Sequence, residues 1–387
     1  MLALAAAGFM LCFWAWALLA PLGPTLREDL DLTSFQQSLV VAVPVIVGSL
    51  GRIPVGALTD RVGARRMFPV VAGLTILPVL YLGHVADSLP TVLVGGFFLG
   101  LGGTTFAIGV PFVNAWYPPE RRGLALGIFG IGTGGTALSS FTTVQLADAV
   151  GYTFPFDVVA GLLAGYALVA RFLLRDRSDR AVPSGSWLAR TTAALRMPVT
   201  VRLALLYAVA FGGFVAFSVY LPTYLTTAYG LGRSDAALRT AGFVVLAVAM
   251  RPVGGWLSDR LHPVPVLIAA YVALAALALL ASFELPLVPL GTLAFLGMAA
   301  AVGAGSGAVF ALVARLVPPE RVGSVTGVVG AAGGLGGFFP PLIMGAVYGV
   351  TDDYTWGYAL LAVTAGVTAA FTATTVRHEA RQGSRPA

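Results

Sequence analysis

Two arginines, Arg52 and Arg251, lie inside long apolar stretches of the chain. Each is six or seven residues, about 10 Å at the rise of an α-helix, from the nearer end of its stretch. An arginine at the centre of a membrane helix costs about 2.5–3.5 kcal/mol on insertion scales. Its planar guanidinium presents a fork of N–H donors that matches an oxyanion and that lysine does not reproduce. The pair predicts a binding site for a small anion; the structural alternative is side chains that reach back to the lipid headgroups.

The stretches that would position these arginines predict an all-α integral membrane protein. Of the 387 residues, 58% are hydrophobic and 10% charged, and the mean hydropathy is +0.88, which is too apolar for a water-soluble domain. The first stretch lacks a basic start and a small-residue cleavage site, so a transmembrane helix is favoured over a signal peptide. Twelve stretches are long enough to cross about 30 Å of hydrocarbon: 1–24, 36–58, 67–84, 89–114, 123–147, 153–174, 199–228, 236–258, 263–282, 287–314, 323–349 and 354–376.

The basic residues indicate the orientation. All 23 are arginines; eighteen lie in the loops after even-numbered spans or in the tail, and three lie on the opposite face, at Arg27, Arg233 and Arg239. By the positive-inside rule, we expect the arginine-rich face and both termini to be cytoplasmic, in the inner (plasma) membrane. The pI near 9.7 then reflects topology, and no nucleic-acid partner is expected. Cys12 is the single cysteine, which excludes an intrachain disulfide and a cysteine metal site; no metal or cofactor is expected.

The sequence repeats at a distance of about 200 residues. Arg52–Arg61 (RIPVGALTDR) superimposes on Arg251–Arg260 (RPVGGWLSDR), and Pro118–Gly130 superimposes on Pro318–Gly330. The repeat predicts two pseudo-symmetric six-helix bundles, 1–174 and 199–376, with a linker at 175–198 and a cytoplasmic tail at 377–387. Transporters built from such repeats bind substrate near the midplane between them. We therefore expect Arg52 and Arg251 to meet there, and the bundles to rock around them.

Two further patterns mark the chain. Glycine is dense in 127–135 and in 330–341, both within expected spans. Such glycines permit close helix packing, and the functional alternative is close approach of bare backbone to a small ligand.

Gly56–Arg66 (GALTDRVGARR) follows the second span. It matches the loop motif G-x-x-x-D-R-x-G-x-R-R of the major facilitator superfamily, and this resemblance implies a cytoplasmic latch between the halves, formed by Asp60, Arg61, Arg65 and Arg66.

Over essentially its whole length the chain resembles the nitrate/nitrite porter family of that superfamily. The family holds its anion with one arginine in the second helix and one in the eighth, and Arg52 and Arg251 match them. The resemblance implies further site residues: Phe106, Tyr207 and Phe211 as pocket aromatics, and Gly132, Thr133, Gly134, Gly333 and Gly334 in the two glycine-rich signatures. Aromatic packing between helices is the structural alternative for the three rings.

Thr133 departs from the family pattern. The first signature usually has an asparagine that contacts the anion, and here a threonine stands in its place. A hydroxyl offers one donor where an amide offers two. The threonine leaves the resemblance intact, but it bears on the affinity for the anion and on the preference between nitrate and nitrite.

These observations predict a secondary transporter, not an enzyme, that exchanges nitrate for nitrite as a monomer in the lipid bilayer. Two desolvated positive charges disfavour closure of an empty carrier, and a bound monoanion offsets them. No carboxylate or histidine is evident near the centre of the expected spans, which argues against a conventional proton relay. The alternatives are a carrier for another small anion, such as cyanate or a small organic acid, with or without proton coupling, and a membrane sensor or enzyme. The last is disfavoured because no metal-ligand or nucleophile–base cluster is apparent within the spans.

Overall fold

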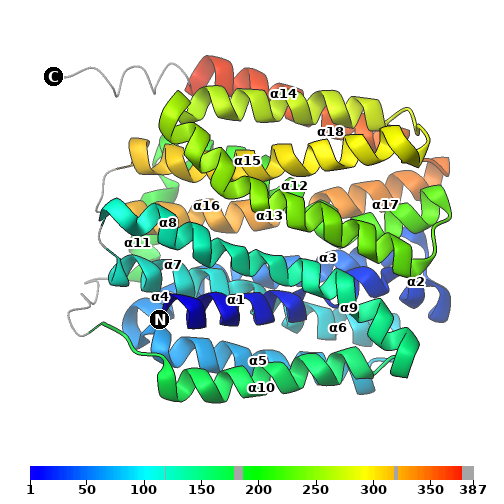
Figure 1. Cartoon of the computed structure of the whole chain (residues 1–387), viewed down its shortest axis with the longest axis horizontal. Coiled ribbons are helices and arrows are strands. Elements are labelled where there is room, and N and C mark those ends of the chain that lie inside the picture. The colour runs from blue at the N-terminus through cyan, green and yellow to red at the C-terminus, as the bar shows by residue number, and fades with distance from the viewer. Residues whose placement is uncertain (118, 178–185, 318–320, 377–387) are drawn as a thin grey trace. The chain divides into compact units, whose positions relative to one another are not determined.

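The computed structural model describes residues 1–117, 119–177, 186–317 and 321–376, and within these ranges the regular structure is helical (Figure 1). Eleven helices are long and apolar enough to cross a membrane, and they match eleven of the twelve expected spans. The fifth expected span, 123–147, falls on α8 (Pro119–Gly130), η2 (Ile131–Gly134) and α9 (Gly135–Val150), where a glycine-rich 3₁₀ turn joins two shorter helices. The expected tail, 377–387, lies outside the described residues.

Many large apolar side chains are exposed along these helices. Leu77 is 65% exposed, Phe172 is 68% exposed and Val363 is 61% exposed. A water-soluble monomer rarely presents so much apolar surface. The lipid tails of a bilayer remove the cost of this exposure, so the surface fits a multi-pass membrane protein.

The chain divides into two compact units. Unit 1 comprises Met1–Trp187 and Phe217–Gly242, and unit 2 comprises Leu188–Ala216 and Phe243–Ala387. The helices α12 (Pro198–Tyr229) and α13 (Arg233–Leu261) each contribute to both units. The bundles expected from the repeat, 1–174 and 199–376, stay a prediction. The expected linker, 175–198, contains one short helix, α11 (Trp187–Leu195), among its described residues.

Unit 1 is a bundle in which α1 packs against several other helices. It contacts α9, η2 and α10, while α5 lies along α10 (Figure 1). A glycine allows α1 and α9 to approach each other closely. A Cβ at Gly135 would lie 2.0 Å from the carbonyl oxygen of Met10, so the two helices meet backbone to backbone. Besides α8, η2 and α9, the elements of this unit, including α1, α5 and α10 just named, have the bounds α1 (Leu2–Trp16), α2 (Leu19–Asp29), α3 (Ser34–Leu50), α4 (Arg52–Val62), α5 (Ala64–His84), α6 (Leu89–Leu99), η1 (Gly100–Thr104), α7 (Thr105–Trp116) and α10 (Phe154–Leu173).

Two expected spans of unit 1 are broken at glycines. The span 36–58 is divided into α3 and α4 at Gly51, and the span 89–114 changes from α6 to the 3₁₀ turn η1 before α7 begins. At the break, η1 packs closely on α3, because a Cβ at Gly103 would lie 2.8 Å from the Cα of Gly48. Short 3₁₀ segments within long helices often mark functional positions, and these two breaks lie beside Arg52.

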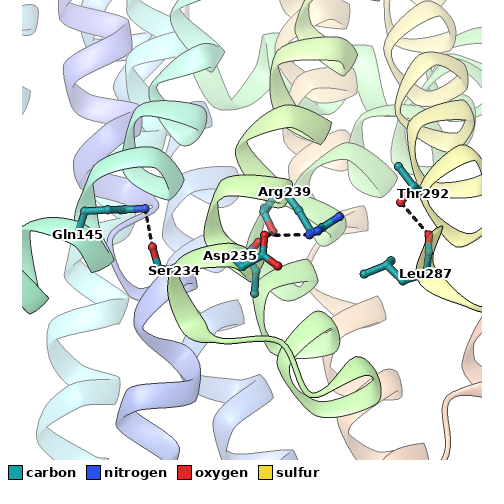
Figure 2. A network of polar contacts seen from close by, with 8 residues as sticks. Gln145, Ser234, Asp235, Arg239, Leu287 and Thr292 are labelled. Atoms are coloured by element: carbon teal, nitrogen blue, oxygen red, sulfur yellow. Dashed lines mark hydrogen bonds and ion pairs between the residues drawn. The ribbon is translucent and has the colours of Figure 1, made fainter. Parts of the chain in front are cut away.

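The segment Phe217–Gly242 belongs to unit 1 through polar contacts with α2, α3 and α9. The buried amide of Gln37 donates to the hydroxyl of Thr223 at 3.1 Å. Gln145 donates to Ser234 at 3.2 Å (Figure 2), and Arg233 forms an ion pair with Glu28. That ion pair is exposed and contributes at most about 1 kcal/mol. Breaking the Gln37–Thr223 bond would take a partner from a buried amide N–H group, and leaving a buried donor unsatisfied costs about 1–3 kcal/mol, so the buried bond holds the segment more firmly than the ion pair.

Unit 2 is built on α14 (Pro263–Ala281), which packs against both α15 (Thr292–Leu316) and α18 (Thr355–Phe371) (Figure 1). A small-residue contact joins α13 to α15. A Cβ at Gly303 would lie 2.2 Å from the carbonyl oxygen of Ala247, and one at Gly307 would lie 2.1 Å from that of Arg251. Glycines four residues apart thus bring α15 onto the backbone of Arg251. The other elements are η3 (Leu287–Gly291), α16 (Val322–Gly336), α17 (Phe339–Thr351) and η5 (Thr372–Val376).

Candidate functional site

Arg52 is buried in unit 1 at the first position of α4, directly after the break at Gly51. Its side chain is 6% exposed. Its Nε donates to the carbonyl oxygen of Gly103 at 3.2 Å, and its guanidinium carbon lies 5.3 Å from the ring centroid of Phe106. The carbonyl and the ring face both favour a cation. These contacts hold the guanidinium inside the unit, which disfavours the headgroup-reaching alternative.

Phe106 belongs to an aromatic cluster. Its ring centroid lies 5.9 Å from that of Phe9 and 6.4 Å from that of Phe129, and the latter two rings stack at 4.7 Å. Gly132 makes room for this cluster, because a Cβ there would lie 2.4 Å from the ring of Phe9. One glycine of the first signature therefore supports the ring cluster that faces Arg52.

Thr133 and Gly134 follow Gly132 in the 3₁₀ turn η2. Thr133 is 1% exposed, and its hydroxyl donates to the carbonyl oxygen of Gly130 at 2.8 Å. Because this bond uses the hydroxyl proton, the side chain would have to rotate in order to donate to an anion. Gly134 has more room than Gly132, since a Cβ there would meet only the end of Met10 at 4.0 Å.

Arg251 lies in unit 2 within α13, where aromatic side chains of α12 face it. Its Nη2 donates to the phenol oxygen of Tyr207 at 3.4 Å. Its guanidinium carbon lies 4.8 Å from the ring centroid of Phe211 and 5.3 Å from that of Phe214. The three aromatic residues are four and three positions apart on one helix and so form a single stripe. The resemblance had implied Tyr207 and Phe211; Phe214 was missed, although this spacing could have indicated it.

Tyr207 is fixed by its neighbours. Its ring stacks on Phe211 with centroids 5.0 Å apart, and meets Phe310 edge to face at 4.8 Å. Gly333 of α16 also lies against it, since a Cβ there would be 2.1 Å from the Tyr207 ring. Gly334, the next residue, is also buried. The second glycine-rich signature thus provides the space in which Tyr207 reaches Arg251.

The loop motif forms a separate polar cluster in unit 1. Gly63, with φ of 92°, ends α4 and turns the chain into α5. The carboxylate of Asp176 accepts the backbone N–H of Ala64 at 3.0 Å and that of Arg65 at 3.2 Å, and a negative charge at a helix N-terminus is stabilising. A pocket of about 400 Å³ is lined by Val62, Arg65, Arg66, Arg175 and Asp176. Sequence reasoning had placed Asp176 only in the linker.

The predicted residues therefore fall into distinct groups. Arg52 and Phe106 come together in unit 1 beside the first glycine-rich signature; Arg251, Tyr207, Phe211 and Gly333 come together in unit 2. Among the predicted latch residues, Arg65 and Arg66 line the pocket, while Asp60 is half-buried and Arg61 is exposed. The latch stays a prediction.

Comparison with known sequences gives consistent matches along the chain. The family model of the Major Facilitator Superfamily matches residues 5–341 and 203–387. The chain is 49% identical to the probable nitrate/nitrite transporter NarK2 of Mycobacterium tuberculosis, over 93% of this chain and 92% of that protein. It is 41% identical to the nitrite extrusion protein of Bacillus subtilis, over 92% of this chain and 88% of that protein.

A solved structure matches in fold. A bacterial homologue of the human lysosomal transporter Spinster, in an inward-facing and occupied conformation, aligns with a TM-score of 0.76. The alignment covers 100% of this chain and 98% of that one, with 19% sequence identity. At this identity the likeness concerns the fold alone, and it agrees with the helical architecture described above.

Proposed function

Because the chain belongs to the nitrate/nitrite porter family of the major facilitator superfamily, we propose that it exchanges nitrate for nitrite across a bacterial inner membrane. Secondary transport is the activity of this fold, and the names of the relatives support the choice of anions. The observation that carries the proposal is the pair of arginines at equivalent positions of the repeat, each held against aromatic rings by its own unit. Both act on the same anion in this proposal.

The charge at the two arginines supports exchange in particular. Each guanidinium lies over an aromatic ring, and Arg52 also donates to a backbone carbonyl while Arg251 donates to a phenol oxygen. Taking a guanidinium out of water costs several kcal/mol. A bound monoanion offsets part of that cost, so the loaded carrier changes conformation more readily than the empty one. Exchange is then faster than net transport in one direction.

The direction of insertion follows from the loops. Eighteen arginines on one face and three on the other support a cytoplasmic location for both termini by the positive-inside rule. A reporter that is active only in the cytoplasm, fused to the C-terminus, is expected to be active; an inactive reporter on a correctly inserted carrier would contradict the orientation.

Counterflow in proteoliposomes tests the proposed exchange. Purified protein is reconstituted into vesicles loaded with nitrite, and isotope-labelled nitrate is added outside. Label is expected to accumulate rapidly in nitrite-loaded vesicles, and about tenfold more slowly in vesicles loaded with an impermeant anion, a ratio that corresponds to about 1.4 kcal/mol of difference between the barriers. A proton gradient alone, with no anion inside, is not expected to drive uptake.

The same assay decides between the candidate cargoes. Unlabelled nitrate and nitrite are expected to compete with the label, whereas cyanate and small organic acids are not. Preferential competition by one of the latter would assign the carrier to another anion. Equal uptake with and without internal nitrite, driven by the proton gradient, would replace exchange with proton-coupled transport.

A further inference from the structure

Phe214 faces Arg251 but is absent from the residues that the family resemblance implied. It is 1% exposed, and its ring centroid lies 5.3 Å from the guanidinium carbon. It also stacks on Phe211, with centroids 5.7 Å apart and planes inclined by 21°. Two adjacent and nearly parallel rings therefore present their faces to one cation.

Arg52, like Arg251, has both an aromatic ring and an oxygen acceptor among its contacts. The Arg52 guanidinium carbon lies 5.3 Å from the ring centroid of Phe106, and its Nε donates to the Gly103 carbonyl. A carbonyl engages an N–H at the edge of the guanidinium, in the same plane as the donors that an oxyanion uses. An aromatic ring attracts the cation over its face through the ring quadrupole and does not need one of the N–H donors. The second ring thus adds attraction for Arg251 without competing for the donors at its edge.

We propose that Phe214 is a positioning residue that holds the Arg251 guanidinium by its face and thereby orients its N–H donors toward the transported anion. The proposal rests on the proposed function in one respect, since the anion bound by Arg251 is taken to be the transport substrate. Phe214 acts through the arginine, because its ring has no hydrogen-bond donor for an anion.

Loss of the Phe214 ring is expected to weaken the binding of nitrate and not to slow the conformational change of the loaded carrier. Without the second ring, the long arginine side chain has more conformations in the empty carrier, and the anion must order it on binding. A cation–π contact of about 1 kcal/mol in this setting corresponds to about a fivefold change in affinity, at 1.4 kcal/mol per tenfold. The maximal exchange rate of the loaded carrier is expected to remain within about twofold of wild type, because the bound anion itself then holds the guanidinium.

The test compares Phe214→Leu with fluorinated phenylalanines incorporated at position 214. Leucine removes the aromatic face but keeps an apolar side chain. Fluorination keeps the shape of the ring while weakening its negative face, so a graded series isolates the electrostatic contribution. The KM for nitrate in counterflow and the nitrate Kd of the purified protein are expected to rise about fivefold for Phe214→Leu, and stepwise with the number of fluorines.

Phe295 of α15 provides the matched control, since it is a buried ring of the same unit that packs against Tyr358. Phe295→Leu and the same fluorinated residues at position 295 are expected to leave the nitrate KM unchanged. An unchanged KM across the series at position 214 would overturn the positioning role, even if Phe214→Leu fails to fold. A wild-type protein that neither binds nor exchanges nitrate would instead overturn the proposed function, so the two failures are distinguishable.

Discussion

Replacing Arg52 or Arg251 with lysine is expected to reduce nitrate counterflow to about 1% of the wild-type rate. Lysine keeps the positive charge but loses the planar fork that binds two oxygens of one anion. Losing a charge-assisted hydrogen bond costs about 1.5–3 kcal/mol, and about 3 kcal/mol corresponds to roughly a hundredfold. Lysine at position 52 also loses the geometry of the bond from Nε to Gly103, and lysine at position 251 loses the contact between the guanidinium and the ring of Phe211.

Arg239 offers the matched control for these two substitutions. It forms an exposed ion pair with Asp235 one helical turn away, at 3.0 Å (Figure 2). Such pairs contribute only about 0.3–0.5 kcal/mol, so Arg239→Lys is expected to transport at close to the wild-type rate. The measurement is initial counterflow per reconstituted protein, combined with nitrate binding in detergent. Full activity of Arg52→Lys or Arg251→Lys would show that a positive charge alone suffices, and it would contradict the proposed binding of two oxygens of one anion by a guanidinium.

The membrane helices were predictable from the sequence because hydrophobic length is a strong signal, but the breaks within them were not. The span 36–58 reads as one apolar stretch, yet α3 ends at Leu50 and α4 begins at Arg52. A 3₁₀ turn and an α-helix have similar composition, so hydropathy does not separate them. Glycine density was the available signal. In 127–135 this density predicts close packing or ligand approach, and it does not predict the change of helix type at η2; the glycines of η1 lie outside the two glycine-dense stretches.

The site was predictable where a residue type carries the chemistry. Arg52 and Arg251 stand out as charges in apolar stretches, whereas the partners that position them do not. Gly103 acts through its backbone carbonyl, which every residue possesses. Asp176 meets two backbone N–H groups of α5 more than a hundred positions away, and nothing in its local sequence indicates that contact. For the same reason, the placement of Phe217–Gly242 in unit 1 depends on pairs such as Gln37 and Thr223 that have no recognisable spacing.

Gly333→Ala is expected to lower counterflow about tenfold and to destabilise the protein. The new methyl group would lie 2.1 Å from the Tyr207 ring, which is itself held between Phe211 and Phe310 and is 1% exposed. The ring has little space to retreat, and overpacking of this kind costs about 1–3 kcal/mol. If Tyr207 moves, its phenol oxygen leaves Arg251, so nitrate binding is expected to weaken together with thermal stability in detergent.

Gly327 separates this steric effect from a general effect of alanine in α16. It lies in the same helix, and a Cβ there would meet nothing within 4 Å. Gly327→Ala is therefore expected to keep wild-type counterflow and to raise stability by up to about 1 kcal/mol, since alanine favours a helix over glycine. Equal behaviour of Gly327→Ala and Gly333→Ala would mean that Tyr207 tolerates displacement. The second glycine-rich signature would then serve helix packing without positioning the arginine that faces the anion.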